Sequence, residues 1–126
     1  IWVALAGPAS NFIMALGWAI GLIVLAGLGV QERFFVEMCR AGVLVNVVMF
    51  ALNMFPLPPL DGGRIVTGLL PPRLAIPYSR VEPWGFFIVM GLIVAGVLST
   101  LWMRPVMSLT YGALNLLLSP ITALLR

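Results

Sequence analysis

Long uncharged stretches alternate with short charged segments along the chain, and this alternation predicts membrane-spanning helices. The first stretch includes about 22 residues from Ala9 to Val30, and about 20 apolar residues are enough to cross a bilayer. Pro8 comes just before them and suits the first turn of a helix, where its missing N–H is no loss. We therefore predict a first span over about residues 9–30.

The second uncharged stretch is shorter and stops at a cluster of prolines. The residues from Ala41 to Phe55, at 1.5 Å each, reach about 22 Å, whereas the hydrocarbon core is about 30 Å thick. Pro56, Pro58 and Pro59 then prevent the helix from continuing. We predict a helix over 41–55 that breaks inside the membrane, where irregular backbone survives only if it is buried in protein or lines a wet cavity.

Two further uncharged stretches follow a polar, proline-rich connection. The stretch over residues 84–103 predicts a third span, with Trp84 and Trp102 as interfacial anchors at its ends. The stretch over 105–125 contains several polar residues, so it either spans the membrane or lies at its interface. The fold expected from this pattern is an all-α integral membrane protein: a multi-span helix bundle forming a single transmembrane domain over residues 1–126.

Composition supports this class and excludes others. The chain is 62% hydrophobic and 9% charged, which does not describe a water-soluble domain. Its net charge of +3 comes from arginines scattered at the ends of apolar stretches, so no basic patch for nucleic acid is expected. Seven arginines without a lysine, together with much alanine, glycine and proline, are typical of a GC-rich bacterial genome. We therefore expect an integral multi-pass protein of a bacterial cell membrane.

The segment "NMFPLPPLDGGR" at residues 53–64 contains the main candidate for chemistry, Asp61. An ionisable side chain at membrane depth is costly and indicates a functional site. Aspartate is also a preferred N-cap, so Asp61 could instead start a short helix over 63–70, and one carboxylate could fill both roles. Asn46 and Asn53 are two helical turns apart, so their side chains lie on one face of the helix and form a polar stripe there.

This segment and "AGPASN" at residues 6–11, each beside an apolar span, resemble the site-2-type intramembrane zinc metalloproteases over about residues 1–72. The resemblance implies a zinc ion held by two histidines of an H-E-x-x-H helix and by the aspartate of a Leu-Asp-Gly motif, here Asp61. It also implies that Asn11, in a Gly-x-x-x-Asn motif headed by Gly7, positions substrate or stabilises an oxyanion. Asn53 is a second candidate catalytic-site residue, with an interhelical hydrogen bond as its alternative role.

The chain departs from this family pattern because it contains no histidine. One aspartate alone cannot hold a catalytic zinc ion, so this polypeptide by itself is expected to be inactive. The chain also starts inside an apolar stretch without an initiating methionine. We therefore expect one zinc per complete chain, with the other ligands encoded upstream of Ile1. A degenerate homologue that never had them is the alternative.

The function expected from the resemblance is zinc-dependent endoproteolysis of transmembrane segments. The partners would be a membrane-protein substrate helix and the lipid bilayer. Two other classes remain open on the sequence: a small transporter or channel subunit that uses Asp61 as a cation or proton site, and a non-catalytic membrane scaffold. An H-E-x-x-H segment upstream would separate the peptidase from both.

Overall fold

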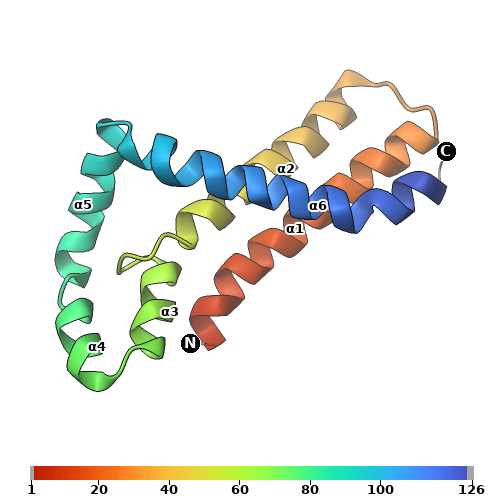
Figure 1. The fold of residues 1–126 in the computed structure, drawn as a ribbon. Coiled ribbons are helices and arrows are strands. Elements are labelled where there is room, and N and C mark those ends of the chain that lie inside the picture. The colour runs from red at the N-terminus through yellow and green to blue at the C-terminus, as the bar shows by residue number, and fades with distance from the viewer. Residues whose placement is uncertain (1, 125–126) are drawn as a thin grey trace.

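The protein is described by a computed structural model over residues 2–124, which contain helices and no strand (Figure 1). Two long helices, α1 and α2, run side by side, and the long helix α6 crosses them (Figure 1). Three short helices, α3 to α5, lie beyond the end of α2 (Figure 1). The elements are α1 (Trp2–Gly27), α2 (Arg33–Asn53), α3 (Asp61–Leu69), α4 (Pro72–Ser79), α5 (Glu82–Val94), the π-helical turn η1 (Ser99–Met103) and α6 (Arg104–Leu124).

The core forms where the three long helices meet. Ala15 of α1, Val47 of α2 and Leu114 of α6 are almost completely buried against one another. Small and branched side chains at the crossing let the helices approach closely, which is how helices associate in lipid without a hydrophobic drive. Many large apolar side chains on the outer faces are exposed, as expected for surfaces that contact acyl chains. The expected all-α membrane helix bundle is confirmed.

The first predicted span is displaced in the structure. Helix α1 starts at Trp2 rather than near residue 9, and its 26 residues make it about 39 Å long. Pro8 therefore lies inside the helix and is buried, so its predicted place in the first turn is wrong. The apolar residues before Pro8 continue the helix, and transmembrane helices tolerate such a proline because neighbouring helices re-satisfy the freed backbone.

The second span is longer than predicted. Helix α2 starts at Arg33, eight residues before the predicted boundary, and its 21 residues reach about 32 Å. The prediction used the last charge, Arg40, as the boundary, whereas charged residues can occupy the first turns of a helix that emerges from lipid. The helix does end at the proline cluster, as predicted, with Asn53 as its last residue. Because α2 is long enough to cross the hydrocarbon core, its length no longer supports the prediction that the helix breaks inside the membrane.

The predicted third span over residues 84–103 is wrong. Helix α5 has 13 residues and ends at Val94, so it reaches only about 20 Å. The chain then turns at Gly96, whose φ of +76° is the left-handed conformation that terminates many helices and that glycine adopts at little cost. Hydropathy alone does not reveal this turn, because the glycine lies within an uninterrupted apolar stretch.

The third helix long and apolar enough to cross a membrane is instead residues Ser99–Leu124, formed by η1 and α6. For the stretch 105–125, the structure therefore favours a span, with residue 125 outside the described residues. Trp102 lies inside this continuous helix, and its indole Nε1 donates to the backbone carbonyl of Ala51 at 2.8 Å. Its indole N–H therefore bonds to protein, and its role as an interfacial anchor stays a prediction. Trp84 is two-thirds exposed, and its anchor role stays a prediction.

Candidate functional site

The chain between α2 and α3 is a tightly turned segment, Met54–Leu60, which we call the proline segment. Backbone hydrogen bonds close two turns in it, from Leu57 N–H to the Phe55 carbonyl at 2.8 Å and from Leu60 N–H to the Leu57 carbonyl at 3.0 Å. The Pro58–Pro59 peptide bond is cis. The result is a compact turn that sets the start of α3 against the residues that follow α2 and places α3 beside α1.

Two glycines let α3 pack against the proline segment. A Cβ atom added to Gly62 would overlap the Met54 carbonyl, and one added to Gly63 would overlap the backbone at Leu57 and Pro58. Both glycines are buried and helical. They are therefore required here for close approach, and not for an unusual backbone conformation.

Asp61 is the first residue of α3, and its carboxylate rests against α1. The N-cap position is held by Leu60 and no side-chain capping bond forms, so the N-cap alternative for Asp61 is wrong. A Cβ atom at Gly7 of α1 would overlap Asp61 Oδ2, which means that the carboxylate occupies the space that glycine leaves free. Asp61 is half-buried in this position. The two motifs found in the sequence therefore meet at one point.

Asn11 lies one helical turn after Gly7 and is half-buried. Its Nδ2 donates to the Gly7 carbonyl at 3.3 Å, which leaves Oδ1 able to accept a hydrogen bond. Because residues four apart share a helix face, Asn11 is on the face of α1 that carries Gly7 and meets Asp61. The Asn11 amide thus lies one helical turn along α1 from Gly7, where the Asp61 carboxylate makes its contact.

Asn53 ends α2 and is also half-buried. Its neighbour Met54 packs against Gly62, the neighbour of Asp61, so Asp61 lies near the end of α2 that carries Asn53. Asn46 lies further from this end and donates to the Gly42 carbonyl of its own helix at 2.8 Å. The Nδ2 donor of Asn46, one of the two residues of the predicted polar stripe, is therefore satisfied within α2.

The metal-binding groups of this chain do not make a complete zinc site. The described residues contain no cluster of three or more His, Cys, Asp or Glu side chains. Among the other carboxylates, Glu82 pairs with Arg64 at 3.0 Å and Glu37 with Arg40 at 3.4 Å. Cys39 packs beside Gly21, which lies about 21 Å along α1 from Gly7. Asp61 is a suitable oxygen ligand, but it would be the only one from this chain.

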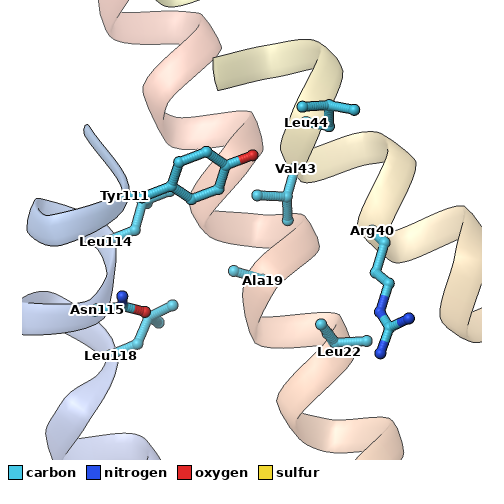
Figure 2. A pocket seen from close by; sticks show the side chains of 9 residues that line it. All are labelled: Ala19, Leu22, Arg40, Val43, Leu44, Tyr111, Leu114, Asn115 and Leu118. Carbon is cyan, nitrogen blue, oxygen red and sulfur yellow. The ribbon is translucent and has the colours of Figure 1, made fainter. Parts of the chain in front are cut away.

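A cavity of about 410 Å³ opens between α1, α2 and α6, away from Asp61 (Figure 2). Its wall on α1 includes Ala19, about 18 Å along the helix from Gly7. Apolar side chains dominate the lining, with Arg40, Tyr111 and Asn115 as its polar members (Figure 2). None of the predicted site residues lines this cavity.

Residues of α4 and α5 contact the proline segment. Tyr78 Oη donates to the Pro56 carbonyl, and burial raises the pKa of this hydroxyl above its usual range. The Arg64–Glu82 pair links α3 to α5, although both side chains are about half exposed and such pairs contribute little. Gly85 is buried with the Pro58 carbonyl against its Cα. No pattern in the sequence indicates these contacts.

A methyl group at Gly85 should loosen this contact. The Cβ of Gly85→Ala would overlap the Pro58 carbonyl, so we expect the variant to unfold at a lower temperature than the wild type in detergent. Gly91→Ala on the same helix is the matched control, because its Cβ would have no neighbour within 4 Å and alanine favours a helix by roughly 0.5–1 kcal/mol. Equal melting temperatures for the two variants would contradict the contact.

Comparison with known proteins supports one family. The profile described as Peptidase family M50 matches residues 29–96. The chain is 32% identical over 103 residues to "Putative zinc metalloprotease YwhC" of Bacillus subtilis (strain 168), covering 75% of this chain and 45% of that protein. It is 31% identical over 97 residues to "Putative zinc metalloprotease Rip2" of Mycolicibacterium smegmatis, covering 77% of this chain and 37% of that protein. No solved structure matches. The chain thus spans less than half the length of these relatives.

Proposed function

Because this chain belongs to peptidase family M50, the site-2 protease family, we propose that the complete protein is a zinc-dependent endopeptidase that cleaves transmembrane segments. The observation that supports this most strongly is the meeting of the two motifs: the Asp61 carboxylate lies against Gly7, one turn from Asn11. Family membership also favours this function over the transporter and scaffold alternatives. The location proposed for the protein is the bacterial cell membrane.

In this proposal Asp61 supplies one zinc ligand, and the others come from residues outside this sequence. The ion would provide Lewis acidity and a water molecule activated at neutral pH. The proline segment and the two buried glycines hold Asp61 at the start of α3, so the carboxylate is positioned by backbone contacts. Asn11 would offer its Oδ1 or Nδ2 to the substrate backbone beside the carboxylate.

The proposal is tested by a cleavage assay with the complete protein. Tagged single-span membrane proteins from the same organism would be reconstituted with it in lipid vesicles, and fragments measured before and after removal of metal with a chelator. We expect cleavage within a transmembrane segment that stops on chelation and returns on addition of zinc. Cleavage that persists in metal-free protein, or no cleavage of any segment by zinc-loaded protein, would refute the proposed activity.

Asn11 should contribute more to turnover than to metal binding. Asn11→Ala removes the amide but leaves Asp61 and Gly7 in place, so we expect turnover to fall by about 100-fold, as for loss of one oxyanion donor, with little change in zinc content. Ser10→Ala is the control, because Ser10 is exposed and its hydroxyl only donates to the Ala6 carbonyl. Equal loss of turnover and zinc in Asn11→Ala would instead indicate a structural role in helix packing.

A further inference from the structure

The end of α2 has an unusual hydrogen-bond pattern. In a continuing α-helix the Phe55 N–H would bond to the carbonyl of Ala51, four residues earlier. It bonds instead to the Leu52 carbonyl at 3.1 Å, which releases the Ala51 carbonyl. The indole Nε1 of Trp102 donates to that carbonyl at 2.8 Å. A side chain 51 residues away in sequence therefore satisfies an acceptor at the end of α2.

This hydrogen bond lies in a buried setting, where its loss would matter. Ala51 is fully buried, and a buried carbonyl without a partner is costly. The Trp102 ring also packs edge-on against Phe55, with ring centroids 5.4 Å apart and an interplanar angle of 79°. The same side chain thus contacts the last turn of α2 and the second residue of the proline segment.

The location of Trp102 on its own helix is also distinctive. Trp102 lies in η1, the only π-helical turn among the described residues, at the start of the long helix α6. A π-helical turn changes the direction of the side chains it carries, and such turns are frequent at functional sites. Here the turn is where α6 contacts the end of α2, so it links the helix core to the proline segment.

We propose that Trp102 is a positioning residue for Asp61, and this inference rests on the proposed zinc-peptidase function. The chain of contacts is short. Trp102 fixes the Ala51 carbonyl and the Phe55 ring. Gly62 packs against the Met54 and Phe55 carbonyls, and Asp61 directly precedes Gly62. A shift at the end of α2 is therefore transmitted through two backbone contacts to the carboxylate. Trp102 itself touches neither substrate nor metal.

The experiment replaces Trp102 in the complete protein with two analogues of nearly the same shape. In 3-benzothienylalanine sulfur replaces the indole N–H, whereas 6-fluorotryptophan keeps it. The first measurement is amide hydrogen exchange, followed at Met54, Phe55 and Leu57. The second is zinc affinity. Trp84, which is two-thirds exposed, receives the same replacements as a control.

For 3-benzothienylalanine at position 102 we expect about fivefold faster exchange in the proline segment, corresponding to the loss of one hydrogen bond, and a similar weakening of zinc binding. Exchange at core residues such as Val47 and Leu114 should not change, and 6-fluorotryptophan should behave as wild type. Unchanged exchange with 3-benzothienylalanine would overturn the inference whether or not zinc binds. Faster exchange with unchanged zinc affinity would overturn the link to Asp61. Absence of zinc from the wild-type protein would instead refute the proposed function, while the exchange result would still report on the Trp102 contact.

Discussion

Replacing Asp61 with alanine in the complete protein should lower its zinc content from about one ion per chain and weaken zinc binding by more than about tenfold. The physical reason is the loss of the one carboxylate that this chain places against α1 beside Asn11. The folded protein should remain in the membrane, because the side chain makes no capping bond and the core lies elsewhere. Metal analysis and a melting curve of the same purified sample measure both quantities.

Glu82→Gln is the matched control for Asp61→Ala. It removes a carboxylate from the same region, one that pairs with Arg64 and is about half exposed. Zinc content should remain at the wild-type value in this variant. A loss of zinc equal in both variants would show that general charge, rather than Asp61 as a ligand, controls metal binding, and unchanged zinc in Asp61→Ala would remove Asp61 from the ligand set.

The second large effect is expected from the residue that makes room for the carboxylate. In Gly7→Ala the new methyl group would occupy the position of Asp61 Oδ2, so either α3 or the carboxylate must move. Displacement of a positioned catalytic group by about 1 Å can cost about 100-fold in rate, and we expect a loss of turnover approaching that size. Cleavage of a reconstituted transmembrane substrate measures it.

Gly17→Ala provides the control on the same helix. A Cβ at Gly17 would meet no atom within 4 Å, and the residue faces outward. This variant should keep wild-type turnover and gain slightly in helix stability. If Gly7→Ala retained wild-type turnover, or if Gly17→Ala lost as much, the contact between Gly7 and Asp61 would have no role in catalysis.

The sequence predicted the helix bundle and the end of α2, but not which apolar stretches form complete spans. Hydropathy records the composition of a stretch and not its backbone path, so the left-handed turn at Gly96 inside residues 84–103 went unnoticed. Charges set the predicted start of the second span at residue 41, whereas Arg33 and Glu37 are compatible with the exposed first turns of α2. The first error comes from reading composition without backbone conformation, and the second from treating charge as the boundary of a helix.

At the site, the sequence predicted the individual residues and the structure added the relations between them. Asp61, Gly7 and Asn11 were identified by motif, but their meeting depends on α1 and α3 packing together, which no local pattern encodes. Glycine is needed at positions 62 and 63 because the backbone of the proline segment approaches them closely, and not because they adopt a conformation closed to other residues. The contact of Trp102 with Ala51 was not predicted, because a tryptophan at the end of an apolar stretch is typical of an interfacial anchor and its spacing from residue 51 indicates no pairing.

X-ray absorption at the zinc edge tests the central claim, that the Asp61 carboxylate is a zinc ligand, most directly. The complete protein would be compared with Asp61→Cys, because a thiolate is also a good zinc ligand and gives a distinct scattering distance. The account predicts only oxygen and nitrogen neighbours at about 2.0–2.2 Å in the wild type and an added sulfur neighbour at about 2.3 Å in the variant. A zinc-loaded variant whose spectrum shows no sulfur neighbour would contradict it.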